Sequence, residues 1–223
     1  MLPTNDFEEL LVSRIVCYGF LCKTFREEID CETLDLAGQP TLLDAMTMWG
    51  NDSVFIDLTR LLPQLSLNAD EELLDNLRLD YTRLFLGPKR LPAPIWESAA
   101  RGSENELYTA HTRSVREFYC KNGFDSTFAK RLVDDHAAVE MEFMCSLANA
   151  AYLAYADNCE ATMRNALRES YRFLHTHLNR WLSLCAQRMQ PIRTHSRFYP
   201  SLMLWASQFA SCDEKWLGEQ GFS

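Results

Sequence analysis

Apolar residues recur along this chain in steps of three and four, and no run of useful length alternates strictly between apolar and polar positions. The first pattern places side chains on one face of an α-helix, whereas a strand requires alternation. Residues 30–39 and 99–104 lack the pattern, and we expect loops there. The sequence therefore predicts an all-α, bundle-like fold with mostly short connections. The predicted helices cover residues 6–26, 42–49, 53–65, 69 or 70 to 86, 106–121, 129 or 134 to 155, 159–188 and 198–217.

The stretch 80–98, DYTRLFLGPKRLPAPIWES, joins the end of one predicted helix to a stiff connection. Tyr81, Leu84 and Phe85 share one face of that helix, which we expect to end near Gly87. The prolines that follow, including Pro94, favour an extended polyproline-like strip. This strip presents Trp96 and Glu97 beside the aromatic helix end, and loops that hold such residues often carry function.

A second polar cluster, Asp134, Asp135 and His136, lies at or near the start of a predicted helix. Either aspartate is suited to cap that helix, which would place His136 in its first turn and on the same face as Glu140. One interpretation is a helix cap with a surface histidine. The other is a polar binding point facing a cleft.

The overall charge favours a cationic partner over a nucleic acid. The chain has 22 Lys and Arg against 31 Asp and Glu, a net charge of −9. Phosphate binding needs clustered cations, so no nucleic-acid partner is expected. No signal peptide and no apolar run of membrane-spanning length is present in the sequence, and we expect a cytoplasmic protein.

Enzyme and metal motifs are absent from the sequence. None of its 8 cysteines form a C-x-x-C pair, and we find no H-E-x-x-H, G-x-S-x-G, P-loop or G-x-G-x-x-G pattern. We therefore expect no catalytic residue, no metal and no cofactor. A helical enzyme or small-molecule-binding protein that uses Asp135 and His136 remains the alternative.

Four short motifs in order, YTRLFLGP, PAPIWES, VDDH and SRFYPSL, give the chain a family resemblance. It resembles the TorD/DmsD/NarJ-like family of cytoplasmic chaperones for molybdoenzymes. The resemblance implies an all-helical fold with a larger N-terminal part (1–98), a hinge near 99–104 and a smaller C-terminal part (105–223). It also implies binding of the twin-arginine leader and the apo catalytic subunit of a molybdenum or tungsten oxidoreductase, and delay of export until the cofactor is inserted.

The resemblance also implies a set of peptide-binding residues. Val133 departs from the family pattern, which usually has proline at this position, and Phe198 and Tyr199 match a motif that we interpret as structural. Exchange of the C-terminal part around the hinge would allow a domain-swapped homodimer. A groove of this kind requires Trp96 and Glu97 to be at least partly exposed. The implied residues are Tyr81, Leu84, Phe85, Pro94, Trp96, Glu97, Asp134, Asp135 and His136.

Overall fold

The computed structural model describes residues 4–50, 53–87, 91, 93–102, 106–128 and 131–223. Within these ranges the regular elements are helices, and the prediction of an all-α fold is confirmed. Among the described residues, Trp96 and His136 form an isolated antiparallel β-bridge. The elements are α1 (Thr4–Arg26), α2 (Cys31–Ala37), α3 (Pro40–Thr47), α4 (Ser53–Leu67), α5 (Glu71–Tyr81), the π-turn η1 (Thr82–Leu86), α6 (Glu97–Arg101), α7 (Ala110–Lys121), α8 (Ala137–Ala156), α9 (Glu160–Thr176), the 3-10 turn η2 (Leu178–Arg180), α10 (Leu182–Met189) and α11 (Phe198–Glu219).

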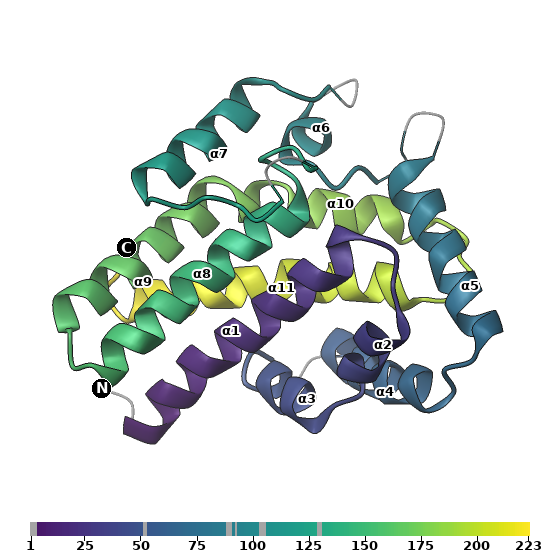
Figure 1. Ribbon diagram of the computed structural model, residues 1–223, viewed down its shortest axis with the longest axis horizontal. Coiled ribbons are helices and arrows are strands. Elements are labelled where there is room, and N and C mark those ends of the chain that lie inside the picture. Colours follow the sequence, from purple (N-terminus) through teal and green to yellow (C-terminus); the bar gives the residue numbers. More distant parts are fainter. Residues whose placement is uncertain (1–3, 51–52, 88–90, 92, 103–105, 129–130) are drawn as a thin grey trace.

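The long helices α1, α8 and α11 run through the middle of the molecule, with α2 to α5 gathered on one side and α7 on another (Figure 1). Helix α1 packs against α8 and α3, and α8 packs against α9. Helix α11 contacts α4, α9 and α10, so it links helices from the first and second halves of the chain. The shorter helices therefore pack mainly against α1 and α11.

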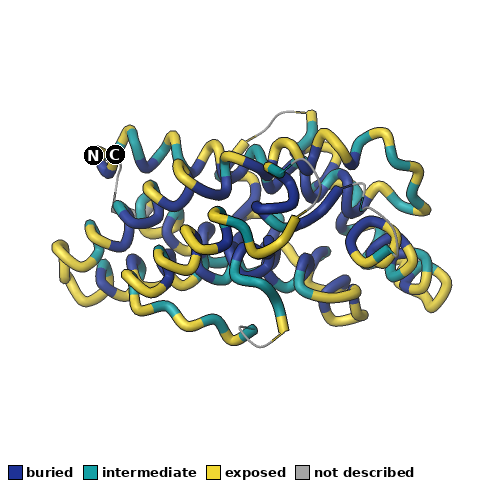
Figure 2. Tube along the Cα trace, turned by 90° about the horizontal axis from the view of Figure 1, so that it is seen from above, coloured by how far each residue is buried: buried dark blue, intermediate teal, exposed yellow. Residues whose placement is uncertain are grey.

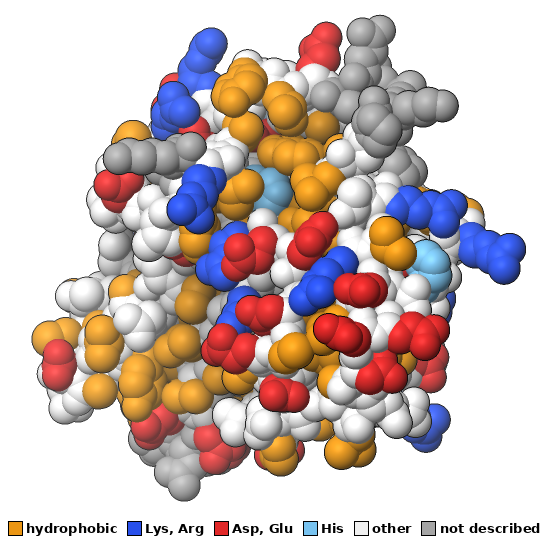
Figure 3. All heavy atoms as spheres, turned by 45° about the vertical axis from the view of Figure 1, so that its right-hand side comes forward, with side chains coloured by type: hydrophobic (Ala, Val, Ile, Leu, Met, Phe, Trp, Pro, Cys, Tyr) orange, Lys and Arg blue, Asp and Glu red, His pale blue; other side chains and the backbone are white. Residues whose placement is uncertain are grey.

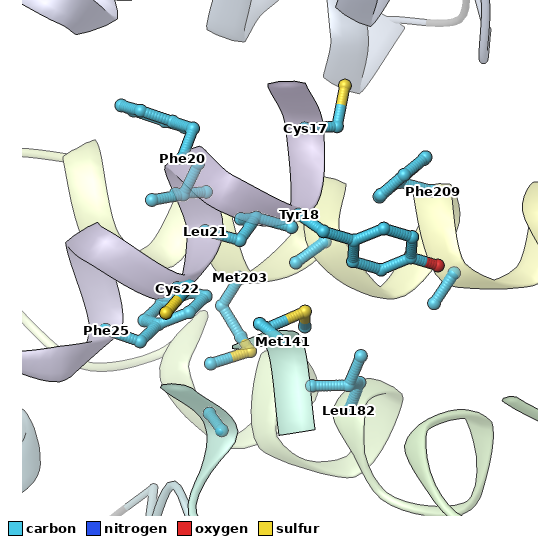
Figure 4. Packing of buried hydrophobic residues seen from close by; sticks show 14 of the residues in the cluster. Cys17, Tyr18, Phe20, Leu21, Cys22, Phe25, Met141, Leu182, Met203 and Phe209 are labelled. Atoms are coloured by element: carbon cyan, nitrogen blue, oxygen red, sulfur yellow. The ribbon is translucent and has the colours of Figure 1, made fainter. Parts of the chain in front are cut away.

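The buried core runs through both halves of the chain. In Figure 4, Leu21 on α1 lies close to Met141 on α8 and Met203 on α11. The ring of Tyr18 on α1 extends toward Phe209 on α11, with centroids 4.6 Å apart, and all these side chains are buried. Figure 2 shows the buried residues as dark blue segments on the inner sides of the helices. The division into parts 1–98 and 105–223, and dimerisation by their exchange, stay predictions.

A buried ion pair ties the first helix to the last. The guanidinium of Arg14 donates to Asp213 at 2.9 Å, and neither side chain is exposed to solvent. The hydroxyl of Tyr18 donates to the same carboxylate at 2.7 Å. Removing one member of such a pair would leave an uncompensated buried charge, so these contacts fix α11 against α1.

The structure corrects the predicted loop at residues 30–39. Helix α2 forms there because Asp30 caps it, accepting the backbone N–H of Thr33 at 2.7 Å. The helix is only seven residues long, which is too short for a clear apolar period. The side chains of Thr33, Leu34 and Ala37 are buried, which explains its packing against α4.

The predicted loop at residues 99–104 is also wrong over its first part. Residues 99–101 belong to α6, and both Ala99 and Ala100 are buried. Small side chains allow this short helix to pack closely against α7 and α10. Residues 103–105 lie outside the described part of the chain, and the hinge stays a prediction.

The long helix predicted for residues 159–188 is interrupted. Helix α9 ends at Thr176, and His177 has non-helical backbone angles (φ −122°, ψ −87°). The apolar period continues across the break because Leu174, Trp181 and Leu182 on both sides are buried in the same core. The periodicity therefore predicted a continuous helix where the structure has α9, η2 and α10.

No helix in the described part of the chain combines the length and the apolar character that crossing a lipid bilayer requires.

Candidate peptide-binding site

Two segments far apart in the sequence are joined at Trp96 and His136. The backbone N–H of Glu97 donates to the carbonyl of Asp135 at 2.9 Å, and the N–H of Ala137 donates to the carbonyl of Ile95 at 2.8 Å. The rings of Trp96 and His136 meet edge to face, with centroids 5.1 Å apart. The start of α8 and the start of α6 are thus held together by backbone bonds, and two predicted site residues become neighbours.

His136 is the N-cap of α8, which corrects two sequence expectations. Its Nδ1 accepts the backbone N–H of Ala138 at 3.1 Å, so neither Asp134 nor Asp135 is the capping residue. His136 also precedes the first turn instead of lying in it. Burial lowers the pKa of His136 to about 3, because a charged imidazole would lose its hydration there. The ring is therefore neutral, as its acceptor role requires.

The two aspartates before His136 have different environments. Asp135 is fully buried, and one of its carboxylate oxygens accepts the backbone N–H of Ser98 at 2.8 Å. Asp134 is partly exposed and pairs with Arg116 at 2.6 Å. The carboxylate of Asp135 therefore belongs to the frame that holds α6, whereas Asp134 faces the surface.

Glu97 is fully buried, and the expectation that it is partly exposed is wrong. One carboxylate oxygen is 2.8 Å from Nδ1 of His177, and the other accepts from the guanidinium of Arg101. A buried carboxylate needs such partners to offset its desolvation. Trp96 is partly exposed as expected, and its indole N–H has no acceptor among the described residues.

A second carboxyl group, on Glu140, lies in the same buried region. It accepts the indole N–H of Trp181 at 3.0 Å and is fully buried. Desolvation, and then the negative charge of Glu97, raise the pKa of Glu140 well above its usual range. Glu97 and Glu140 therefore form an internal polar network that links α6, α8 and the α9–α10 break.

The predicted aromatic face of the helix end is turned inward. Tyr81, Leu84 and Phe85 are buried, and the Tyr81 hydroxyl donates to the carbonyl of Phe25 at 3.1 Å. Tyr81 and Phe85 both contact the ring of Tyr199 at the start of α11. Burial of Tyr199 agrees with the structural interpretation of its motif.

A surface hollow of about 570 Å³ lies beside this frame, at the carboxyl end of α1. Three of the nine predicted site residues, Tyr81, Trp96 and His136, are in its lining. Leu84, Phe85, Pro94, Glu97, Asp134 and Asp135 are not among the lining residues. The hollow is lined by Arg26, Glu27, Glu28, Asp30, Tyr81, Leu86, Trp96, Leu132 and His136.

We call Glu27, Glu28 and Asp30 the acidic rim of this hollow. With Arg26 as the one cation in the lining and His136 neutral, the hollow carries an excess of negative charge. Hydrogen bonds from Thr33 hold the pKa of Asp30 below its usual range, so this carboxylate stays ionised. Figure 3 shows a side of the molecule on which Asp and Glu side chains gather below an area of hydrophobic ones.

Sequence reasoning missed the acidic rim. The signal is present as REEID, which begins at the last residue of the predicted helix 6–26 and ends at the first residue of the predicted loop 30–39. Their distance from residue 96 in the sequence hid the contact, because only the packing of α1 against α8 brings them together. Exposed Leu86, 57% accessible, completes the apolar part of the lining.

Chemically, the hollow combines an apolar wall with carboxylates at one edge. Carboxylates accept paired hydrogen bonds from guanidinium groups, and a half-buried tryptophan offers a face to a cation or an apolar side chain. Among the described residues, no cluster of His, Cys, Asp or Glu has the arrangement of a metal site. The arrangement suits a peptide with basic and apolar residues.

The chain matches a known protein family. A family model described as nitrate reductase delta subunit matches residues 52–187, more than half of the chain. No curated protein matches the chain. The matched range includes Tyr81, Trp96 and His136, whereas the acidic rim lies before it. The resemblance deduced from the sequence motifs is confirmed, and the chain belongs to the nitrate reductase delta subunit family, a family of molybdoenzyme maturation chaperones.

Proposed function

We propose that this chaperone binds the twin-arginine leader of a molybdoenzyme catalytic subunit in the hollow at the end of α1, and that it holds the apo subunit while the cofactor is inserted and export is delayed. The observation that carries the proposal is the joining of three predicted peptide-binding residues with an acidic rim in one hollow. The family supports a molybdoenzyme catalytic subunit as the partner.

The acidic rim supplies the recognition of the arginine pair. Glu28 accepts one hydrogen bond, from the Thr82 hydroxyl at 2.7 Å, and a carboxylate has room for several donors. Guanidinium groups bind carboxylates through two parallel hydrogen bonds, a geometry that lysine does not reproduce. The proposal therefore predicts a preference for arginine over lysine at the pair.

The apolar wall supplies the second part of the binding. Trp96, Leu132 and Leu86 line the hollow beside the rim. An apolar stretch after the arginines would cover these side chains, as amphipathic helices do in hydrophobic grooves. The buried residues Glu97, Asp135 and His136 contribute indirectly, because they fix the position of Trp96.

The experiment is a calorimetric titration with a synthetic leader that carries the arginine pair, and with the same peptide carrying two lysines. We expect the arginine peptide to bind, and the double variant Glu27→Gln, Glu28→Gln to weaken it about tenfold, with the loss shrinking as salt rises. The matched control is Glu71→Gln, Glu72→Gln, which makes the same charge change in the first turn of α5. No binding at high micromolar concentration, or an equal loss in the control, would contradict the proposal.

A further inference from the structure

Two buried carboxyl oxygens at the junction of α6 and α8 have no hydrogen-bond partner among the described residues. They are Oδ1 of Asp135 and Oε1 of Glu140, and both side chains are fully buried. Leaving a buried polar atom unpaired destabilises a fold, and leaving a buried charge unpaired destabilises it more. The two oxygens therefore call for an explanation that pairs them.

Asp135 and Glu140 hold a fixed relation at the start of α8. His136 is the N-cap of this helix, so Asp135 is the residue before the cap and Glu140 lies four residues after it. Side chains at these two positions pack against each other in the hydrophobic staple, where both are normally apolar. Here both are carboxyl groups. Burial first, and then the charges of Glu97 and Asp135, raise the pKa of Glu140, which agrees with two side chains that face each other.

The second oxygen of each group is already engaged. Oδ2 of Asp135 accepts the backbone N–H of Ser98 at 2.8 Å. Oε2 of Glu140 accepts the indole N–H of Trp181 at 3.0 Å. Two carboxylates in one buried site cannot both ionise, because their like charges repel each other there. A proton on Oε1 of Glu140 makes this oxygen a donor and gives Oδ1 of Asp135 the hydrogen bond that it lacks.

The cations of this region have another acceptor. Glu97 on α6 is bonded to the guanidinium of Arg101 and to Nδ1 of His177. Neither Asp135 nor Glu140 forms an ion pair with another residue in the described part of the chain. A proton is therefore the positive charge that is suited to hold these two carboxyl groups together.

We propose that Asp135 and Glu140 share one proton between Oδ1 and Oε1, and that this acid–carboxylate pair positions Trp96. Trp96 is the N-cap residue of α6 and has no side-chain cap of its own. Asp135 supplies the cap from the other segment, because its carboxylate accepts the N–H of Ser98 in the first turn of α6. Its backbone carbonyl also accepts the N–H of Glu97, at 2.9 Å. The pair thus fixes the carboxylate that holds the start of α6, and with it the Trp96 ring in the lining of the hollow.

The shared proton is tested by infrared difference spectroscopy on the whole chain near neutral pH, where an acid C=O band is separate from carboxylate bands. We expect an acid band that Glu140→Gln removes. Asp135→Asn should shift this band, because it replaces the accepting carboxylate by a neutral amide. The matched control is Glu169→Gln, which removes a buried carboxylate paired with Lys121 and Arg172 and should leave the band unchanged.

Rescue by the conservative variant separates the shared hydrogen bond from packing. Glu140→Gln keeps an N–H donor for Asp135, whereas Glu140→Leu has a similar volume and no donor. We expect hydrogen exchange at the backbone N–H groups of Glu97 and Ser98 to be at least tenfold faster in Glu140→Leu and close to wild type in Glu140→Gln. Calorimetry with the arginine-pair leader should show a several-fold loss of affinity for Glu140→Leu alone, an expectation that rests on the proposed function.

Three results would overturn the inference. They are the absence of an acid band that Glu140→Gln removes, a band that Asp135→Asn leaves unchanged, and equal hydrogen exchange in Glu140→Leu and Glu140→Gln. The infrared result decides the shared proton even if Glu140→Leu does not fold, since it uses the conservative variants only. A wild-type chain that shows the acid band and the exchange pattern but binds no leader would contradict the proposed function and leave the Asp135–Glu140 pair supported.

Discussion

The buried frame around Glu97 and the acidic rim around Glu28 are both rich in carboxylates, yet they differ in what surrounds them. Glu97 has no solvent exposure and is satisfied by His177 and Arg101. Glu28 is exposed and accepts one hydrogen bond from a threonine. A buried charge that is satisfied internally maintains the fold, whereas an exposed charge beside an apolar hollow is free to meet a ligand. Under the proposed function, the motif residues hold the site in place and the rim residues face the partner.

The largest expected effect on stability is at the buried contacts of Glu97 with His177 and Arg101. Glu97→Ala leaves the His177 imidazole and part of the Arg101 guanidinium without their buried acceptor. We expect the free energy of unfolding to fall by about 3 kcal/mol, as for other broken buried pairs. Urea denaturation measures this loss. A loss below about 1 kcal/mol would show that Glu97 is not a structural carboxylate.

The pH dependence of stability tests the neutral cap at His136. Its folded-state pKa is about 3, below the ordinary 6.5. The unfolded state therefore takes up a proton as the pH falls below 6.5, and the folded state does not until near 3. The free energy of unfolding should fall by up to about 1.4 kcal/mol per pH unit in this window.

The variant that isolates this term is His136→Asn, because asparagine keeps a capping acceptor and does not titrate. The stability gap between wild type and variant should narrow as the pH falls from 6.5. A gap that stays constant between pH 6.5 and 4.5 would mean that His136 is protonated in the folded protein.

Glu140 should change the free energy of unfolding with pH in the opposite direction to His136. Its raised pKa means that the folded state keeps a proton that the unfolded state releases above pH 4.5. The stability from Glu140 is thus present below 4.5 and is lost as the pH rises. Glu140→Gln should become progressively more stable than wild type from pH 5 to 7, by up to about 1.4 kcal/mol per unit. Parallel stability curves would contradict a neutral Glu140.

The smallest effect on stability is expected at the rim. Glu28→Gln removes one exposed charge and keeps an acceptor for the Thr82 hydroxyl. The free energy of unfolding should change by less than about 0.5 kcal/mol. A clear loss of stability in a denaturation series run beside Glu97→Ala would mean that the rim is part of the frame and would remove the contrast between the two regions.

The sequence predicts the fold well because periodicity reports burial directly. The periods of α1, α5 and α11 were sufficient to place those helices. Periodicity does not report breaks such as the one at His177, since both sides of it face one core. It also does not report α6, four of whose five residues are buried.

The candidate site was predicted in part. Trp96 and His136 stood out as an aromatic and an imidazole near proline and aspartate, and the structure joins them by a backbone bridge. Glu97 and Asp135 stood out for the same reason, although their hydrogen bonds go to the chain itself. Nothing in the local pattern reports whether a carboxylate is buried, since that depends on how helices from both halves pack.

The most direct test of the account is a double-mutant cycle between the acidic rim and the leader. The affinity of the arginine-pair leader is measured by calorimetry for wild type and Glu28→Gln, each with the native peptide and with one arginine replaced by glutamine. A direct contact predicts a coupling free energy of about 1 kcal/mol or more for one of the two arginines. Coupling within about 0.3 kcal/mol of zero for both arginines would contradict the proposal that the rim receives the arginine pair.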